Sequence, residues 1–509
     1  MLLDRVAEVS AQVAATSGRN AKVTLIADLL REAQADERAL VADYLTGRLP
    51  QGRIGVGWRS LSEDSPPAAE PSLTVTEIDS TFTELDATRG TGSSARRAEL
   101  LSAVWRSATD RERTLLRGLL LGDLRQGAGD GIMLKAIAEA AGVTEAAVRR
   151  AVMLAGFAGP VAATALAEGE PGLAEIGLEV GRPVRPMLAG SAPDVAAAVT
   201  GGPQSIEVKL DGIRCQAHKR GDQVWLFTRS LDDITDRLPE IASAVRSLAA
   251  DTLVLDGEVI ALREDGSPHP FQVTGARTAS RGDPDELARA TPLTPLFFDL
   301  LHVDGQDLID RPASERRQAL ESLVPSEWVV TAEPVTDPVA AQAFFDDWVA
   351  RGHEGVIVKA TDSAYAAGRR GAGWVKVKPR HTVDLVVLAV EHGSGRRKGY
   401  LSNIHLGARV GDELVMVGKT FKGMTDAMLA WQTERFTELT VDDNGWVVSL
   451  RPEQVVEIAF DGLQTSRRYP GGVALRFARV IRYRDDKTAE QADTLDTLRR
   501  VAGMVEGNA

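Results

Sequence analysis

The segment SIEVKLDGIR, residues 205–214, carries the side chains best suited to covalent chemistry. In a strand, alternation places its apolar side chains on one face and Glu207 and Lys209 on the other. A lysine with the reference pKa of about 10.4 is almost fully protonated at neutral pH. Neighbouring cations, such as Arg214, and a bound metal must lower that pKa before the amine of Lys209 can attack. The same pattern also fits a surface strand that ends in an Asp-Gly turn with incidental charges.

Other charged segments could hold the phosphates of a substrate. The segment WVKVK places Lys376 and Lys378 on one face of a strand, where two ammonium groups could clamp a phosphate. The segments 354–359 (EGVIVK) and 256–258 (DGE) supply carboxylates beside glycines, where the backbone can approach a ligand closely. Taken singly, each of these segments also fits a solvated strand or an ordinary turn, and Phe298 fits a core residue.

The first 180 or so residues are predicted to be helical, because apolar residues recur at helical spacing in VTLIADLLREA and RTLLRGLLLGDL. Thr109 and Glu112 fit a capping box that begins the second of these helices. The polar stretch 62–97 is typical of a loop or flexible connection. Segment 137–156 resembles a helix-turn-helix, although a plain helical hairpin accounts for it better.

From about residue 185 the sequence changes to short β-branched runs broken by Asp-Gly turns, as in SIEVKLDG, TLVLDGEVI and PLFFDLLHVDG. Helices are expected between some of them, in LARAT and ERRQALESL. After Val383 the chain stays rich in strands, with no long helix before DTLRRVAGMV, which fits a small β-barrel of roughly 120 residues. We therefore predict a multidomain α+β protein with helical residues 1–182, an α+β domain over 183–382 and a barrel over 383–509.

The composition limits the kinds of metal site and compartment. The 509 residues contain one cysteine, Cys215, and seven scattered histidines, which cannot build a structural zinc site. Any metal should therefore be bound by oxygen ligands, and magnesium is the first candidate. No apolar run approaches the roughly 20 residues of a membrane span. The N-terminus lacks an apolar secretory core, so we expect a cytoplasmic protein with no membrane partner.

The net charge of −13 argues mildly against nucleic-acid binding. Affinity for nucleic acid depends on local basic surface rather than on the total charge. Two segments supply such surface, RFARVIRYR (476–484) and GSGRRKG (393–399). Either segment alone also fits a solvated face.

The order of the motifs is more informative than any one of them. K-x-D-G, D-G-E, F-D, E-G and K-x-K, followed by an Arg-rich strand, resemble the covalent nucleotidyltransferase superfamily of DNA ligases, RNA ligases and mRNA capping enzymes. The segments SSARRAELLSAVWRSAT and LLRGLLLGDLRQGAGDGIMLKAIAEAAGV resemble the DNA-binding domain of archaeal-type and eukaryotic replicative ATP-dependent DNA ligases. VRPMLA (184–189) resembles the start of their adenylation domain. The resemblance runs from residue 1 to the mid-490s and is strongest to bacterial ligases of the archaeal-like type.

The resemblance implies an OB-fold for the barrel and a role for each motif residue. Lys209 would form a phosphoramidate with AMP. The nucleotide would be bound by side chains that contact its base, ribose or phosphates: Glu207, Arg214, Arg229, Glu258, Phe298, Val356, Arg370, Lys376 and Lys378. Among these, Glu207 would read the adenine amino group, and Phe298 and Val356 would stack on the two faces of the base. Magnesium would be held by Glu258 and Glu354. The leaving pyrophosphate would be oriented by charged residues late in the barrel: Arg476, Arg479, Arg482, Asp485 and Lys487.

The resemblance also implies ATP and Mg²⁺ as cofactors and nicked duplex DNA as the partner. Lysine adenylation would be followed by transfer of AMP to the 5′-phosphate and by sealing with the 3′-hydroxyl. A barrel tethered near residues 379–383 could move between the first step and DNA binding. We expect a monomer that closes around DNA. A sliding clamp cannot be read from the sequence, and replication, repair and recombination are not distinguished.

Three other functions fit parts of the sequence. An RNA ligase or a GTP-dependent capping enzyme would share the core motifs but would not need the large helical domain. An NAD-dependent ligase carries a cysteine-ligated zinc module, which a single cysteine excludes. A non-catalytic DNA-binding protein that works through segment 137–156 would leave the ordered lysine and carboxylate motifs unexplained.

Overall fold

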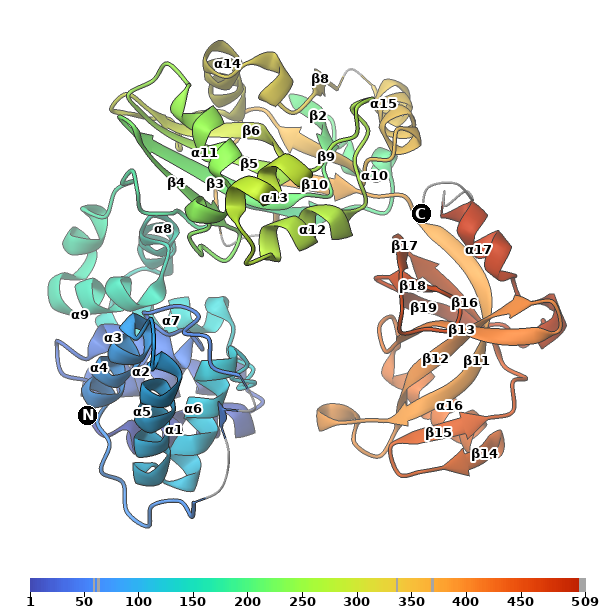
Figure 1. Cartoon of the computed structure of the whole chain (residues 1–509), viewed down its shortest axis with the longest axis horizontal. Coiled ribbons are helices and arrows are strands. Elements are labelled where there is room, and N and C mark those ends of the chain that lie inside the picture. Colours follow the sequence, from blue (N-terminus) through green and yellow to red (C-terminus); the bar gives the residue numbers. More distant parts are fainter. Residues whose placement is uncertain (58–59, 62–64, 336, 368–369, 503–509) are drawn as a thin grey trace.

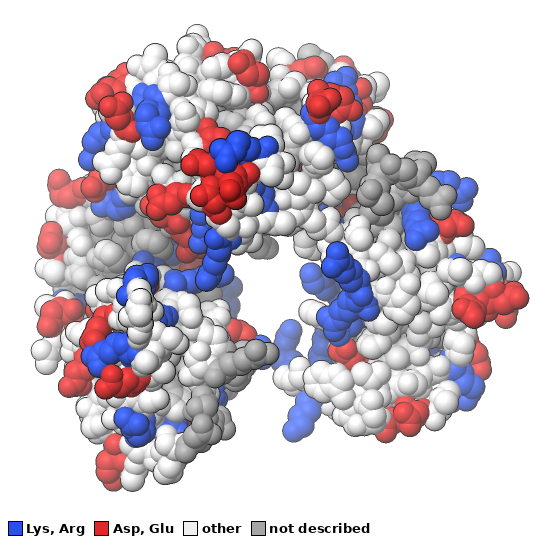
Figure 2. Space-filling model, viewed as in Figure 1, with Lys and Arg blue, Asp and Glu red and all other residues white. Residues whose placement is uncertain are grey.

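The computed structural model describes residues 1–57, 60–61, 65–335, 337–367 and 370–502. Figure 1 shows a helical domain, a central α+β domain and a C-terminal β domain arranged around an open middle. The space-filling view in Figure 2 shows the same opening between the helical domain and the β domain, with the central domain above it. Among the described residues, no helix is long and apolar enough to span a membrane.

The helical domain packs around one apolar core that includes Leu29, Leu45 and Phe82. Its elements are α1 (Leu3–Ala15), α2 (Arg19–Glu32), α3 (Arg38–Leu45), α4 (Val75–Ala87), α5 (Ser93–Ser107), α6 (Asp110–Leu121), α7 (Asp130–Ala141), α8 (Glu145–Ala155) and α9 (Ala158–Ala174). The side chain of Thr109 accepts a hydrogen bond from the backbone N–H of Glu112, and the Glu112 carboxylate accepts one from the N–H of Thr109. The predicted capping box is therefore confirmed.

The polar stretch 62–97 is not a loop throughout, because it contains α4 and the start of α5. Thr74 begins α4 with a second capping box. The apolar side chains of α4 follow helical spacing and are buried: Val75, Ile78, Phe82 and Leu85. The loop prediction is wrong here because a single apolar stripe is sufficient to dock an otherwise polar helix.

The helix-turn-helix-like segment 137–156 forms the second half of α7, a tight turn and the whole of α8. Met153 and Leu154, at the end of α8, pack in an apolar cluster that they share with the central domain. Arg150 on the same helix donates hydrogen bonds of 2.8 and 2.7 Å to Asp310 of the central domain. α8 therefore docks one domain on the other, in agreement with a helical hairpin and not with an exposed recognition helix.

The described strands of the central domain form two five-stranded sheets. The first has the order β1 (Leu188–Ser191), β10 (Arg370–Val377), β9 (Gly355–Ala360), β2 (Gln204–Lys209) and β8 (Ala332–Pro334). The second has the order β4 (Gln223–Thr228), β3 (Ile213–Arg220), β5 (Thr252–Ile260), β6 (Thr294–Val303) and β7 (Gln306–Asp307). Helices lie around these sheets: α10 (Val195–Ala198), α11 (Pro239–Arg246), α12 (Phe271–Ala279), α13 (Pro284–Ala290), α14 (Ala313–Leu323) and α15 (Pro338–Ala350).

Asp256 and Gly257 lie inside β5, so the Asp-Gly turn predicted at this point is wrong. The pairing of β5 with β6 shifts register between these two residues. A Cβ at Gly257 would lie 2.6 Å from the carbonyl oxygen of Leu296, which explains why glycine occupies a strand here. The continuous strand places Asp256 and Glu258 opposite Gln216 and Arg214 of β3.

The C-terminal β domain is built on a sheet of β11 (His381–His392), β12 (Leu401–Val410), β13 (Glu413–Thr420), β14 (Thr440–Asp443), β15 (Val447–Leu450), β16 (Val455–Phe460) and β19 (Arg479–Tyr483). β17 (Gly462–Thr465) and β18 (Val473–Arg476) form a separate hairpin, and α17 (Leu495–Val501) follows. The domain also contains α16 (Asp426–Glu438), which contradicts the prediction of no long helix in this region. α16 is capped by Thr425 and buries Leu429 and Phe436, and Phe436 packs in the core of the β domain.

Candidate active site

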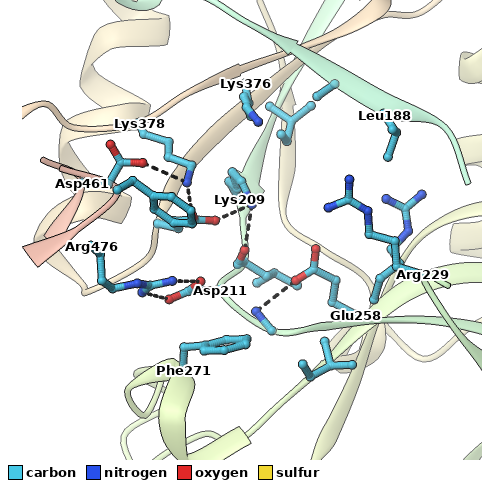
Figure 3. Close-up of a pocket in the computed structure, with 18 of the residues that line it drawn as sticks. Leu188, Lys209, Asp211, Arg229, Glu258, Phe271, Lys376, Lys378, Asp461 and Arg476 are labelled. Carbon is cyan, nitrogen blue, oxygen red and sulfur yellow. Dashed lines mark hydrogen bonds and ion pairs between the residues drawn. The ribbon is translucent and has the colours of Figure 1, made fainter. Parts of the chain in front are cut away.

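A cavity of about 1630 Å³ opens between the two sheets of the central domain and the β domain. Lys209, at the end of β2, points into it (Figure 3). The apolar residues that alternate with Glu207 and Lys209 pack in the cluster beneath the sheet: Ile206, Val208 and Leu210. The strand alternation predicted for this segment is therefore confirmed, and its polar face forms the wall of the cavity.

The charges nearest to Lys209 are carboxylates. Its Nζ forms an ion pair with Glu354 and donates a 3.1 Å hydrogen bond to the carbonyl of Leu210. Burial opposes the charge on Lys209, but Glu354, Glu258 and Asp211 outweigh burial and raise its pKa. The cations that were expected to lower this pKa do not dominate the surroundings of Lys209, so the amine is held in its charged form.

Glu354 joins Lys209 to Lys378. One carboxylate oxygen pairs with Lys209 and the other with Lys378, whose Nζ also lies 3.2 Å from Asp461 of the β domain. These two lysines outweigh the effect of burial and lower the pKa of Glu354. Gly355 follows with a φ of +139°, and a Cβ there would collide with the carbonyl of Val377. Glycine is needed for β9 and β10 to approach closely enough for this contact.

The inner end of the cavity is formed by Glu207, which is buried. Glu207 pairs with Lys359 at 2.6 Å and lies 3.9 Å from Arg317. Burial outweighs both cations and raises the pKa of Glu207. The Nζ of Lys359 lies 4.3 Å from the ring centre of Trp374 and 4.8 Å from that of Phe298. Aromatic rings beside a buried carboxylate suit a flat base that carries a hydrogen-bond donor.

Sequence reasoning missed Lys359 and Trp374 as cavity residues, although both lie in segments that it singled out. The expectation that Val356 faces the base is wrong, because its side chain is fully buried in the core beneath the first sheet. The next residue, Ile357, lines the cavity instead. Alternation along β9 explains the difference, since Glu207 pairs with Ile357 and Lys209 pairs with Gly355 across the sheet.

Arg214 and Glu258 extend the wall on the second sheet. Arg214 forms a two-pronged ion pair with Asp256, with an Nε–Oδ1 distance of 2.6 Å, and its guanidinium lies 4.7 Å from the ring centre of Phe298. The Glu258 carboxylate accepts a 3.0 Å hydrogen bond from the N–H of Gly212, and burial raises the pKa of Glu258. The exposed Arg229 also lines the cavity (Figure 3).

Lys376 lines the cavity beside Lys378, as the strand alternation predicted. The predicted phosphate contact of Arg370 is different, because it depends on a side chain that lies outside the described residues. The backbone of Arg370 begins β10.

Two of the charged residues predicted late in the barrel reach the cavity. Arg476 pairs with Asp211 through two hydrogen bonds, and Arg479 lies 3.1 Å from Asp461. Sequence reasoning missed their neighbour Phe477, which is 52% exposed and has a φ of +55°. Lys378 and Lys422 lie 5.1 and 5.6 Å from its ring centre.

The structure does not bring the other three late-barrel residues into the cavity. Arg482 pairs with Glu457 at 2.7 Å, and Asp485 accepts a 3.0 Å hydrogen bond from Gln454. Lys487 pairs with Asp384 at 2.5 Å. Among the described residues that line the cavity, none of these three is present. β19 and the turn after it place these three residues along the β domain and away from the cavity.

The carboxylates suit a magnesium ion only in part. Among the described residues, no group of three or more His, Cys, Asp or Glu side chains has a metal-binding arrangement. Glu258 and Glu354 nevertheless line the same cavity as Lys376 and Lys378. Magnesium commonly takes one or two carboxylates and completes its shell with water and substrate phosphates. The residues present therefore fit a magnesium ion that enters with a phosphate ligand.

The two-sheet core with a lysine in its cavity, flanked by a helical and a β domain, has the architecture of a nucleotidyltransferase. The description "ATP dependent DNA ligase domain" matches residues 186–378, "ATP dependent DNA ligase C terminal region" matches 397–487, and "DNA ligase N terminus" matches 56–138. The chain belongs to the ATP-dependent DNA ligases.

Individual relatives give the same result. A "Probable DNA ligase" of Beutenbergia cavernae is 59% identical over 99% of this chain and 100% of that protein. One of Streptomyces griseus is 56% identical over 98% and 99% of the two chains. The solved structure of "Pmar-Lig_PreS3" shares the fold, with a TM-score of 0.64 at 20% identity over 94% of this chain and 99% of that one. These families and relatives do not support the RNA-ligase or capping-enzyme alternative.

Proposed function

We propose that this DNA ligase uses Lys209 as its nucleophile and seals nicks in duplex DNA through a lysyl-AMP intermediate. The observation that carries the proposal is the position of Lys209, which lies on the cavity wall and shares the carboxylate of Glu354 with Lys378. A single carboxylate between two amines can hold the nucleophile in place while the second amine faces the phosphates. The family uses ATP, and we assign the adenylate to this lysine.

In the first step, the neutral amine of Lys209 attacks the α-phosphorus of ATP. A nitrogen–phosphorus bond forms, the bond to the bridging oxygen breaks, and pyrophosphate leaves. The proton of the ammonium must be lost before attack, and Glu354 is the group in contact with it. Lys376 and Lys378 neutralise phosphate charge, which is the main requirement that phosphoryl transfer places on a protein.

We assign the inner end of the cavity to adenine. Glu207 would accept a hydrogen bond from the exocyclic amine, and Phe298 would stack on the base with Ile357 near its other face. The ribose and phosphates would then lie along the second sheet, within reach of three polar side chains: Arg214, Arg229 and Glu258. Arg370 remains a proposed phosphate contact from the resemblance alone.

Glu258 and Glu354 would hold magnesium together with the phosphates. When bound, the ion supplies positive charge that stabilises the transferring phosphoryl group. Neither carboxylate is free in this structure, since Glu354 pairs with Lys209 and Lys378 and Glu258 accepts from Gly212. Binding of the ion with its phosphates would therefore have to redistribute these contacts.

In the later steps, a 5′-phosphate oxygen of the nick attacks the adenylate, and the lysine–phosphorus bond breaks. The 3′-hydroxyl then attacks the activated phosphate and AMP leaves. We propose that the β domain moves between lysine adenylation and DNA binding, because Arg482, Asp485 and Lys487 lie outside the cavity. Removal of residues 383–509 should slow lysine adenylation, and an unchanged rate would contradict a role of this domain in the first step.

The duplex would occupy the opening between the domains. Figure 2 shows Lys and Arg side chains gathered on the edge of the β domain that faces this opening. Such local positive charge supports DNA binding despite the net charge of −13. We further propose that the protein acts in the cytoplasm as a monomer that closes around DNA.

The test is to incubate the protein with α-labelled ATP, GTP or labelled NAD and then to add unlabelled nicked duplex. We expect only ATP to label the protein and the label to move to the 5′ end of the nick before sealing. A duplex with the nick in an RNA strand is the matched control, and it should be sealed poorly. Labelling by GTP or NAD, or protein label that nicked DNA does not remove, would contradict the proposal.

A further inference from the structure

A strap of residues 180–187 connects the helical domain to β1 and lies along β3. Alternate side chains of β3 hold the strap by hydrogen bonds. At its start, Arg220 donates to the carbonyl of Val180 (2.6 Å), and His218 accepts from the N–H of Gly181 (3.0 Å). Further along, Gln216 accepts from the N–H of Val184 (2.8 Å) and donates to its carbonyl (3.2 Å), and Arg214 donates to the carbonyl of Met187 (3.3 Å). The strap is therefore fixed along its length and ends at Arg214.

His218 shows how closely the strap is fitted. Its side chain is buried and its pKa is lowered by burial to about 3, so the imidazole is neutral. Since Nδ1 accepts from Gly181, Nε2 carries the proton and donates to the side-chain oxygen of Gln216 at 2.9 Å. Every polar atom of the imidazole thus has a partner in the strap or in β3.

Where the strap ends, a buried tyrosine joins it to the active site. The hydroxyl of Tyr365 accepts a hydrogen bond from the N–H of Met187 (2.8 Å) and donates one to Asp256 (2.7 Å). Asp256 is fully buried and receives both prongs of the Arg214 guanidinium. Arg214 in turn reaches back to Met187. The four groups form a closed ring of hydrogen bonds, with only Arg214 facing the cavity among them.

We propose that Tyr365 is a positioning residue that fixes the guanidinium of Arg214 through Asp256. The strap is the second support of the same guanidinium, through the carbonyl of Met187. Leu188, the residue after Met187, lines the same cavity as Arg229, so the end of the strap also shapes the proposed nucleotide site (Figure 3). The inference rests on the proposed contact of Arg214 with the nucleotide and deepens it.

Removing the hydroxyl of Tyr365 should weaken ATP binding more than it lowers the stability of the protein. In Tyr365→Phe, the carboxylate of Asp256 loses one donor and the N–H of Met187 loses its acceptor. The guanidinium of Arg214 would then sample positions away from Phe298, and ATP would bind less well. A contact made equally in the ground state and the transition state affects half-saturation rather than the maximal rate.

The experiment measures lysine adenylation by the full-length protein in single turnover at a series of ATP concentrations. For Tyr365→Phe we expect the half-saturating ATP concentration to rise about tenfold, which equals about 1.4 kcal/mol. We expect the maximal rate to stay within about threefold. Tyr44→Phe is the matched control, because its hydroxyl is buried and has no hydrogen-bond partner among the residues that the structure describes. It should leave the ATP dependence unchanged.

Arg214→Gln and the double variant separate this inference from the proposed function. If Tyr365 acts through Arg214, adding Tyr365→Phe to Arg214→Gln raises half-saturation by no more than about twofold. Effects that multiply, or a Tyr365→Phe protein that behaves like Tyr44→Phe, would overturn the positioning role while leaving the function intact. If Arg214→Gln itself leaves ATP dependence unchanged, the proposed contact of Arg214 is wrong.

A second variant covers the case in which Tyr365→Phe does not fold. Asp256→Asn keeps an oxygen that can accept from Tyr365 but removes the charge that holds Arg214. It should show the same rise in half-saturating ATP and the same lack of additivity with Arg214→Gln. If Asp256→Asn has the same half-saturating ATP concentration as the unaltered protein, that result alone would overturn the inference.

Discussion

Arg476 and Asp211 lie 265 positions apart in the sequence and are joined by two hydrogen bonds, of 2.5 and 3.1 Å. Asp211 belongs to the turn that directly follows Lys209, whereas Arg476 ends β18 of the β domain. The hydrogen bonds that Arg476 donates to Asp211 raise the pKa of Arg476 and outweigh burial, which lowers it. The β domain thus contacts the segment that directly follows the strand of Lys209, the proposed nucleophile.

Arg476→Ala should slow lysine adenylation by roughly tenfold, because a two-pronged charged contact that closes the domain is lost. Sealing of a nick that already carries AMP should be affected less, since Lys209 does not react in that step. The measurement compares the two rates in the same preparation. Arg451→Ala is the control, because Arg451 pairs with Glu453 away from the cavity. Equal losses in both steps would show that Arg476 does not act through this closed conformation.

The first step should depend steeply on pH. Glu354, Glu258 and Asp211 raise the pKa of Lys209 against the effect of burial. A raised pKa leaves a smaller fraction of neutral amine, so the adenylation rate at low ATP should increase with pH from 6 to 9, by about tenfold per unit. Sealing of pre-adenylated nicks provides the control and should show a shallower profile. A flat profile for adenylation would mean that deprotonation of this lysine does not limit attack.

Glu207 and Lys359 should depend on each other for stability. Both are buried and lie 2.6 Å apart, so replacing either one leaves its partner in the core without its nearest counter-charge. Lys359→Gln or Glu207→Gln alone should lower the free energy of unfolding by about 3–5 kcal/mol. The double variant should recover at least half of that loss, as measured by urea denaturation. Additive losses in the double variant would contradict the pairing.

Local pattern was sufficient to predict the side chains that lie next to one another along a strand. Alternation placed Lys209 and Glu207 together on β2, and Lys376 with Lys378 on β10, and the structure has both pairs facing the cavity. The predicted fold class, with a helical domain, an α+β core and a β-rich C-terminal domain, is confirmed as well. The OB-fold and the domain boundaries remain predictions.

Features set by contacts between distant segments could not be predicted. The sequence around Asp256 does not show that its carboxylate accepts a hydrogen bond from Tyr365. Nor does it show that β6 leaves no room for a side chain at Gly257 inside the strand. α16 was missed because its buried stripe is short and lies among strands. The assignment of Val356 was wrong by one residue, since a run of apolar residues does not show by itself which of them faces the cavity.

The most direct measurement is to locate the adenylate. The protein is incubated with ATP, digested and examined by mass spectrometry, alongside Lys209→Ala and a control, Lys135→Ala, in which an exposed lysine of the helical domain is replaced. We predict AMP on the peptide that contains Lys209 in the unaltered protein and in Lys135→Ala, and none on Lys209→Ala, which should also fail to seal nicks with ATP. AMP on another residue, or labelling and sealing by Lys209→Ala, would contradict the account.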